Sequence, residues 1–282
     1  SIFIILKFLL INKSIRLLPI KPNPPVIIIL CIFYRILDIV GNLKFISTMS
    51  LSLQNLTFVI VTFKSEHVIY DCINSLPKES KIIIIENSND IKLKNDLESK
   101  YQNINVIVQN NTGMGSANNL GLKLSETEYA FVINPDVKFY KGCIEKLIDF
   151  SKKKYDFSIL APILDNDKIP NYKIKNISPN IGNEDFIEVD SVDGFAMLFN
   201  KKNFKDNEYF DENFFLYLEN DDLCLRKIKE KKKIYVLKTA LISHLGGQSV
   251  SPKLKLEIEN SRNWHWMWSR FYFNRKHYGY IK

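Results

Sequence analysis

Short apolar runs and amphipathic stretches alternate along the chain from residue 57 onward. The apolar runs have the length of buried strands and are rich in β-branched residues. They lie at 57–63, 81–85, 105–109 and 129–133. Between them, apolar positions recur at helical spacing at 66–76, 93–101 and 115–124. Strands that alternate with helices in this way predict an α/β fold with a mostly parallel, Rossmann-like sheet and helices on both of its faces.

Each of these expected strands ends in polar residues. The four ends are Lys64-Ser65, Glu86-Asn87, Asn110-Asn111 and Asn134-Pro135-Asp136. Ligands of parallel α/β sheets bind beyond the carboxyl ends of the strands. We therefore expect these polar residues to converge on one crevice.

The regular alternation is lost after Pro162. A polar stretch at 165–188, which contains two prolines, is expected to form a loop or a lid. A strand-like segment is expected at 189–200, a helix at 219–229 and a strand at 234–237, before an aromatic and basic tail that begins near residue 254. The simplest organisation is one domain over 49–282.

Residues 1–48 differ from the rest of the chain. Basic residues and prolines interrupt their apolar runs, so none reaches the roughly 18 to 20 apolar residues that span a bilayer. The order of charges does not match a signal peptide either. Met49 stands directly before the first expected strand. We therefore expect an N-terminal extension outside the fold, with a basic anchor on a membrane surface as the alternative.

Composition and charge give no support to nucleic-acid binding. The chain has 282 residues, 46% of them hydrophobic, and a formal net charge of +8. Residues 1–48 hold six Lys or Arg against one Asp, so +5 of the +8 lies there and +3 remains for the rest. A net charge this small over a whole domain does not indicate a nucleic-acid surface. The four cysteines are far apart and lack zinc-ligand spacing, which indicates a reducing, cytoplasmic compartment.

The sequence Asn134-Pro135-Asp136 is the most informative motif. A carboxylate at a strand end beside an amide carbonyl suits Mg²⁺ or Mn²⁺, since such an ion keeps several waters and binds diphosphate oxygens. A simple Asn-Pro-Asp turn is the alternative, and the other motifs favour the metal. Asp136 is therefore the candidate metal ligand. His244, after the last expected strand, is a second candidate for the metal or the diphosphate, although a lone histidine is more often structural.

A glycine-rich segment, NNTGMGSANNLG, lies at 110–121 and opens a helix. It lacks the Gly-Lys-Ser/Thr of a phosphate-binding P-loop. Gly113 and Gly115 would let backbone approach a nucleotide or a sugar, and Asn118 and Asn119 could present their amides to it. Asn111 is a further candidate contact. Glycine turns of this kind are common, so the segment indicates a nucleotide or sugar site only together with the other motifs.

Three acidic residues crowd the start of the helix expected at 219–229. Acidic residues in a first turn are favoured by the helix dipole, so simple capping is one interpretation. Glu219, Asp221 and Asp222 would also repel one another and raise a pKa, which suits a general base for a sugar hydroxyl. Arg226 lies one helical turn from Asp222 and could orient it or balance its charge.

Taken in order, these motifs resemble those of the family 2 glycosyltransferases, in particular bacterial rhamnosyltransferase-like members that build surface polysaccharides. The resemblance extends over about residues 56–279. Its blocks are VIVTF, IIIIENS, NNTGMGSANNLG, NPD, VDGFAMLFNKKNF, FDENFFLYLENDDLCLR, HLGGQS and RNWHWMWSRFYFNRKHYG.

The resemblance implies a GT-A fold, in which a nucleotide-binding half is fused to an acceptor-binding half. It also implies inverting transfer of a sugar from a nucleotide-diphosphate donor to a saccharide or lipid-linked acceptor. The leading donor is dTDP-rhamnose, and a UDP-sugar is the other class.

Roles for individual residues follow from the same resemblance. Thr62 and Glu86 lie where the nucleoside is usually held. Asn134 and Asp136 match the DxD-type metal motif, with Asn134 in place of its first Asp.

The acceptor side of the family pattern is also present. Gly194 and Phe195 match the segment that faces the acceptor. Asn220 stands where the family often has Asp, which leaves the base open between Glu219, slightly favoured, and Asp222, with Asp221 expected to be solvated.

Two other functions are compatible with parts of this pattern. A nucleotidyltransferase that makes sugar nucleotides would be expected to carry a basic glycine-rich loop near the first strand, which VTFKSEHV lacks. A non-catalytic sugar-nucleotide-binding module would not need the acidic residues.

The aromatic and basic tail suits peripheral contact with a membrane, where a lipid-linked acceptor would be found. The alternative is a helix packed on the catalytic domain or against a second subunit of a homodimer.

Overall fold

The computed structural model describes residues 51–153, 157–166, 169–174, 185–205, 208–246 and 255–279. All of these residues belong to one compact unit, Met49–Lys282. The expectations for residues 1–48 lie outside the described residues.

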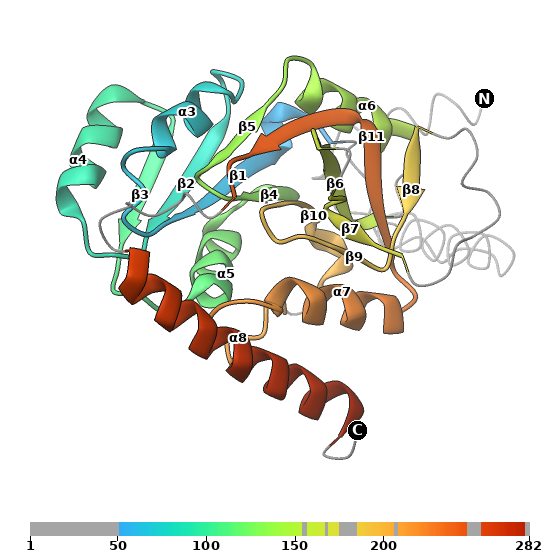
Figure 1. Ribbon diagram of the computed structural model, residues 1–282. Coiled ribbons are helices and arrows are strands. Elements are labelled where there is room, and N and C mark those ends of the chain that lie inside the picture. Colours follow the sequence, from blue (N-terminus) through green and yellow to red (C-terminus); the bar gives the residue numbers. More distant parts are fainter. Residues whose placement is uncertain are drawn as a thin grey trace, which may run out of the picture. The chain divides into compact units, whose positions relative to one another are not determined.

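The secondary-structure elements are numbered along the chain (Figure 1). The helices are α3 (Ile69–Asn74), α4 (Ile91–Lys100), α5 (Met114–Leu124), α6 (Cys143–Lys153), α7 (Glu219–Lys229) and α8 (Lys255–Tyr278), with short 3-10 turns η1 (Leu53–Asn55) and η2 (Lys201–Asn203). The strands are β1 (Leu56–Thr62), β2 (Lys81–Glu86), β3 (Ile104–Val108), β4 (Tyr129–Ile133), β5 (Val137–Phe139), β6 (Phe157–Leu164), β7 (Tyr172–Lys173), β8 (Phe186–Glu188), β9 (Ser191–Val192), β10 (Ala196–Asn200) and β11 (Lys233–His244).

Within the described residues, nine strands form one sheet in the order β3-β2-β1-β4-β10-β6-β11-β5, with β8 paired to β11. Strands β3, β2, β1 and β4 run parallel, as the alternating pattern predicts. Strand β10 is antiparallel to both β4 and β6, and β11 is parallel to β6. The first half of the sheet is therefore a Rossmann-like parallel half, and β10 joins it to a mixed second half.

Helices cover both faces of the sheet, and the core divides accordingly. All seven residues of β1 are buried, which explains why the strand is apolar throughout rather than alternating. Phe58 and Ile60 pack in the same cluster as residues of α3, α4 and α6. Val59 packs with residues of α5 and α7 on the opposite face, and Val61 also packs against α5.

Three expectations about the second half need correction. The polar stretch 165–188, insofar as it is described, contains β7, which pairs with β9, and β8, which pairs with β11. The strand-like segment 189–200 is divided into β9 and β10 by a turn at 193–195. The strand expected at 234–237 continues to His244 through an irregularity between Leu237 and Leu241.

The tail folds as α8, whose side chains are described from residue 259. Among the described residues, no helix combines the length and the apolar character needed to cross a membrane. The three described cysteines, Cys72, Cys143 and Cys224, are buried thiols that form no disulfide.

Candidate active site

The carboxyl ends of β1, β2 and β3 are tied together by backbone hydrogen bonds. The Asn87 N–H donates to the Thr62 carbonyl at 2.8 Å, and the Gln109 N–H donates to the Glu86 carbonyl at 2.9 Å. The ends of these three strands therefore lie side by side, and their convergence on one crevice stays a prediction. Thr62 is fully buried, and its hydroxyl has no hydrogen-bond partner among the described residues.

The carboxylate of Glu86 is engaged within its own loop. It accepts hydrogen bonds from the Ser88 N–H, the Ser88 hydroxyl and the Asp90 N–H at 3.1, 2.5 and 2.6 Å. Asp90 in turn caps α4 by accepting from the Leu93 N–H at 2.9 Å. Glu86 therefore shapes the loop that follows β2.

Asn87, predicted only as part of a polar strand end and given no role of its own, organises the neighbouring loop. Its amide nitrogen donates to Asn111 Oδ1 at 3.0 Å, and its amide oxygen accepts from Gln109 Nε2 at 2.9 Å. Asn111 Oδ1 also accepts from the Gly113 N–H at 3.1 Å. Asn111 is thus held as part of the loop. The position of Asn87, a polar residue directly after Glu86 at a strand end, was the signal that could have identified it.

The glycines of the 110–121 segment face protein rather than open space. A Cβ on Gly113, whose φ is +88°, would lie 2.6 Å from the Phe215 carbonyl oxygen. A Cβ on Gly115 would lie 3.3 Å from Phe210 Cβ, and one on Gly121 would lie 2.3 Å from Val59 Cγ1. In this structure the glycines allow α5 to pack closely on β1 and on the segment 210–215.

Two neighbouring amides on α5 have different surroundings. Asn119 accepts from the Phe210 N–H and donates to the Phe210 carbonyl, so it fixes the segment that leads to α7. Asn118 is 3% exposed, and its side-chain oxygen has no partner among the described residues. Of the two, Asn118 retains an unused acceptor.

Asp136 lies just beyond β4 and is almost completely buried. Its side chain is 1% exposed, and neither carboxylate oxygen accepts a hydrogen bond within the described part of the chain. His244 Nε2 lies 3.2 Å from Asp136 Oδ1. A buried charge without hydrogen bonds is costly unless a cation or a ligand compensates it.

This donor set fits a hard divalent cation. No cluster of three or more His, Cys, Asp or Glu side chains that could hold a metal is present among the described residues. Mg²⁺ commonly needs fewer protein ligands, because one or two carboxylates act together with waters and substrate phosphates. Asp136, with His244 beside it, matches that arrangement.

A turn at 193–195 lies against His244. The ring of Phe195 stacks on His244 with centroids 4.1 Å apart, and the Phe195 carbonyl accepts from the Asn134 N–H at 2.9 Å. Asp193 lies in the VDGF segment but is not among the predicted site residues. Its pKa is raised chiefly by burial, while Lys173 and His244 oppose the shift.

The same turn also contacts the start of α7. A Cβ on Gly194 would lie 3.4 Å from Asn220 Cβ, so the backbone approaches the helix closely. The Asn220 amide donates to the Val192 carbonyl at 2.8 Å. The predicted residues Gly194 and Phe195 therefore bridge the region of Asp136 and the acidic start of α7.

Glu219 begins α7 and differs from the other two acidic residues. It is 7% exposed, and its Oε2 atom has no hydrogen-bond partner among the described residues. Burial, followed by the charge of Asp221, raises the pKa of Glu219 to about 7. Tyr217 and Leu218 directly before it both have positive φ values, 70° and 65°, an unusual backbone conformation that is found at functional sites.

Asp222 is fully buried, and three basic side chains contact its carboxylate. It accepts from Arg226 Nε at 2.8 Å, as the spacing predicted, and from Lys276 Nζ at 2.7 Å and His277 Nε2 at 2.8 Å on α8. Burial lowers the pKa of His277, although Asp222 opposes the shift. These contacts indicate that Asp222 has a structural role.

Asp222→Asn is expected to lower the free energy of unfolding by about 3 kcal/mol, the lower end of the range for a broken buried ion pair, since Lys276 keeps its bond to Asp211. Chemical denaturation measures this, and amide hydrogen exchange should rise in α8. Lys276→Gln serves as the control and should cost less, because Asp222 keeps Arg226 and His277. Equal stability of Asp222→Asn and wild type would contradict the structural role.

The expectation that Asp221 is solvated is wrong. Its side chain is 14% exposed and pairs with Lys173 Nζ at 2.8 Å, and it accepts from the Ser191 hydroxyl at 2.5 Å. Lys173 lies in β7 and Ser191 in β9, two short strands that the sequence pattern did not reveal. Asp221 therefore anchors α7 to this strand pair.

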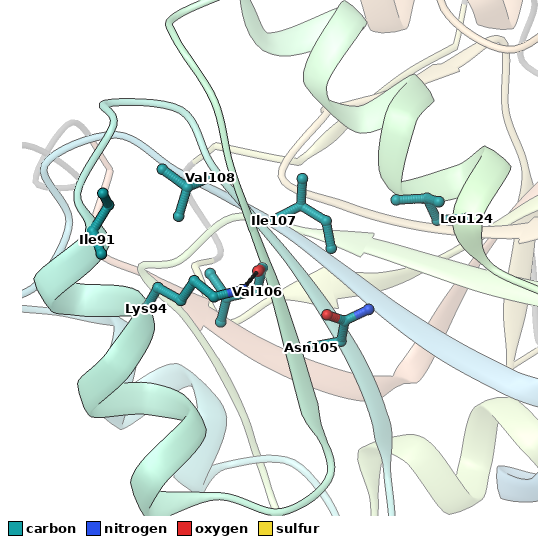
Figure 2. A pocket seen from close by; sticks show the side chains of 7 residues that line it. All are labelled: Ile91, Lys94, Asn105, Val106, Ile107, Val108 and Leu124. Carbon is teal, nitrogen blue, oxygen red and sulfur yellow. Dashed lines mark hydrogen bonds between the residues drawn. The ribbon is translucent and has the colours of Figure 1, made fainter.

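A cavity of about 640 Å³ lies at the outer edge of β3, away from these residues. Figure 2 shows its lining, which is mainly apolar: Ile91, Lys94, Asn105, Val106, Ile107, Val108 and Leu124. Lys94 Nζ donates to the Val106 carbonyl at 2.6 Å, so its charged end is engaged. No residue of the candidate site lines this cavity.

Comparison with known proteins gives one family match. The model of Glycosyl transferase family 2 matches residues 57–208. That range includes Thr62, Asp136 and Phe195 and ends before Glu219 and His244.

A similar curated protein is the low-salt glycan biosynthesis hexosyltransferase Agl10 of Haloferax volcanii. The two are 26% identical over an alignment of 200 residues that covers 64% of this chain and 64% of that protein. The matched part thus spans just under two thirds of the relative's length.

Solved structures with a similar fold include GalNAc-T7 with UDP, GalNAc and Mn²⁺, at a TM-score of 0.57 and 14% identity over 78% of this chain and 49% of that chain. Another is S. aureus TarS, at a TM-score of 0.52 and 17% identity over 69% of this chain and 37% of that chain. These similarities concern the fold alone.

Proposed function

This chain belongs to the family 2 glycosyltransferases, and we propose that it transfers a hexose from a nucleotide-diphosphate donor to a saccharide or lipid-linked saccharide acceptor. The hexosyltransferase from Haloferax volcanii supports the hexose, and rhamnose is the leading sugar on sequence resemblance. The setting we propose is the cytoplasmic side of a cell membrane, in the synthesis of a surface polysaccharide.

One observation carries the proposal. Asp136 keeps a buried carboxylate that accepts no hydrogen bond from the described residues, at the edge of the sheet where ligands of parallel α/β folds bind. A protein maintains such a group at a cost to stability, and that cost is recovered when a cation and a diphosphate bind.

On the donor side, we propose that Thr62 and Asn118 supply unused polar atoms toward the nucleotide. The loop that Glu86 and Asn111 shape, with Gly113 and Gly115 behind it, forms the surface on which the nucleoside lies. Asn134 and Asp136 face the diphosphate, with His244 beside Asp136.

A divalent ion held by Asp136 and His244 would supply positive charge that offsets the charge developing on the leaving diphosphate. GalNAc-T7, which shares the fold, was solved with Mn²⁺. We therefore propose Mg²⁺ or Mn²⁺ as the cofactor.

Glu219 is the base that we propose for the acceptor hydroxyl. A general base works best when its pKa is near the operating pH, and burial brings the pKa of Glu219 to about 7. Removal of the acceptor proton by Glu219 would allow direct displacement and inversion at the anomeric carbon. Gly194 and Phe195, which bridge the two parts of the site, would contact the acceptor.

The test is thermal stabilisation of the full chain by UDP-, dTDP- and GDP-sugars, each with and without Mn²⁺. We expect one nucleotide class to raise the melting temperature, with the larger rise in the presence of Mn²⁺. A ligand at a hundred times its dissociation constant stabilises the folded state by about 2.7 kcal/mol, which is readily measured. The matching nucleoside monophosphate is the control, since it lacks the diphosphate. A folded protein that responds to none of the donors would contradict the proposal.

A further inference from the structure

Helix α8 packs against the segment 215–218, which leads directly into α7 (Figure 1). Ser269 of α8 is fully buried, and its hydroxyl donates to the Leu216 carbonyl at 2.7 Å. One helical turn before it, the ring of His265 stacks on Phe215 with centroids 4.3 Å apart. Since residues four apart lie on the same face of a helix, one face of α8 holds two consecutive residues of this segment.

The next two residues of the segment form an unusual turn. Tyr217 and Leu218 have φ values of 70° and 65°. Bulky side chains rarely adopt this conformation, and it persists only where the surrounding structure imposes it. Trp266, three residues before Ser269 on α8, supplies part of the restraint, since its ring meets the Tyr217 ring edge to face with centroids 5.6 Å apart. Helix α8 therefore contacts each residue from 215 to 217.

This turn determines where the carboxylate of Glu219 lies. Leu218 is the N-cap residue of α7, and its carbonyl accepts from the Asp222 N–H at 2.9 Å. Glu219 is the first residue of the helix, and its Oε2 atom has no hydrogen-bond partner among the described residues. A change of φ at position 217 or 218 would therefore turn the start of α7 and move the carboxylate, and no described partner of Oε2 would hold it back.

We propose that Ser269 is a positioning residue for Glu219, and that His265 and Trp266 support it in holding the turn 217–218. The inference rests on the proposed function, in which Glu219 is the base. It adds that the C-terminal helix, far from Glu219 in sequence, is needed to place the base. Without the bond from Ser269, the turn would relax toward negative φ, and Glu219 would leave its buried position.

The charged and titratable groups around Glu219 come from α7, from the turn and from α8. Burial, and then the charge of Asp221 in α7, raises the pKa of Glu219 to about 7. Burial also raises the pKa of the Tyr217 phenol, a rise that Arg262 of α8 opposes and Glu219 increases. Since burial is the main cause for Glu219, a displaced and more exposed carboxylate should have a pKa closer to its ordinary value of 4.5.

Ser269→Ala removes the hydroxyl that holds Leu216. We expect kcat for sugar transfer to fall roughly tenfold to a hundredfold, because a misplacement of about 1 Å can cost that much, while KM for the donor stays the same. The rise of kcat with pH should also move to lower pH. Ser261→Ala, which changes an exposed serine of the same helix, is the matched control and should behave like wild type. Unchanged stabilisation by the donor with Mn²⁺ would show that Ser269→Ala is folded and binds its donor.

Two further variants test the turn itself. Leu218→Gly, added to Ser269→Ala, should regain most of the lost kcat, because glycine adopts positive φ without steric cost. Trp266→Leu removes the contact with Tyr217 from a position that is 45% exposed, so the fold should tolerate it. Its kcat should fall, and its pH profile should shift in the same direction as in Ser269→Ala.

The variant Glu219→Gln separates this inference from the proposed function. If Glu219→Gln loses activity while Ser269→Ala keeps the kcat and the pH profile of wild type, the positioning role is wrong and Glu219 remains the base. A loss of kcat in Ser269→Ala without a shift of the pH profile, or one that Leu218→Gly does not reverse, would also overturn the inference. Full activity of Glu219→Gln would instead contradict the proposed base, and the positioning role with it.

Discussion

Replacing Asp136 with asparagine is expected to lower kcat by roughly a thousandfold, equivalent to about 4 kcal/mol, while the metal-free protein becomes more resistant to heat. The loss of activity follows from the loss of the carboxylate that would hold the cation. The gain in stability follows because the carboxylate is buried, and neither of its oxygens accepts a hydrogen bond within the described part of the chain. Asparagine is similar in size and carries no charge to bury.

Two measurements separate these effects. Donor turnover is measured at saturating Mn²⁺, and the melting temperature is measured in the presence of a chelator and again with Mn²⁺ and donor. Asp149→Asn is the matched control, since its carboxylate is 67% exposed on α6 and should matter to neither measurement. Full activity of Asp136→Asn would remove Asp136 from the metal site, and a lower melting temperature in chelator would show that the buried charge is compensated.

Glu219→Gln is expected to lower kcat by about a hundredfold to ten-thousandfold with little change in KM, the usual contribution of a general base. The wild-type rate should also depend on pH in a defined direction. The base must be deprotonated, and its pKa is about 7, so kcat should rise with pH up to about 7 and level off above it. In Glu219→Gln this step in the profile should be absent. Glu126→Gln, a substitution at an exposed position, is the control.

The same carboxyl group links pH to stability. Its folded-state pKa is about 7 and its unfolded value is 4.5, so between these pH values the folded protein keeps a proton that the unfolded chain has lost. Stability therefore falls as pH rises through this window and is constant above it. Glu219→Gln should remove this fall, and an unchanged pH dependence of the melting temperature would contradict the assignment.

The sequence was sufficient for the parallel half of the fold because β1, β2 and β4 are almost entirely buried on both faces and therefore give continuous apolar runs. Strand β4 lies at the predicted residues, and β1, β2 and β3 differ from the prediction by one residue at their ends. The short strands β7 and β8 could not be predicted, because two or three residues give no periodicity and their pairing depends on β9 and β11, distant in sequence.

The candidate site shows the same limit. Sequence spacing placed Glu219 and Asp222 in one helical turn and could not separate their roles. The difference arises from α8, since Lys276 and His277 reach Asp222 from more than fifty residues away, whereas Glu219 Oε2 has no hydrogen-bond partner among the described residues. The glycines of α5 were likewise read as facing a ligand because nothing local in the sequence shows that Phe210 and Phe215 pack against them.

The position of β10 has a consequence for how the chain matures on the ribosome. Strands β1 to β4 can pair as soon as residue 133 has emerged, but β10, residues 196–200, later covers the open edge of β4. For more than sixty residues of synthesis the nascent chain therefore presents an unpaired, apolar edge strand, which is a template for wrong pairing. Truncated products that end between β4 and β10 are expected to depend most on chaperones. If the protein is divided into two separately expressed halves, they are expected to fold only when β10 stays with the N-terminal half.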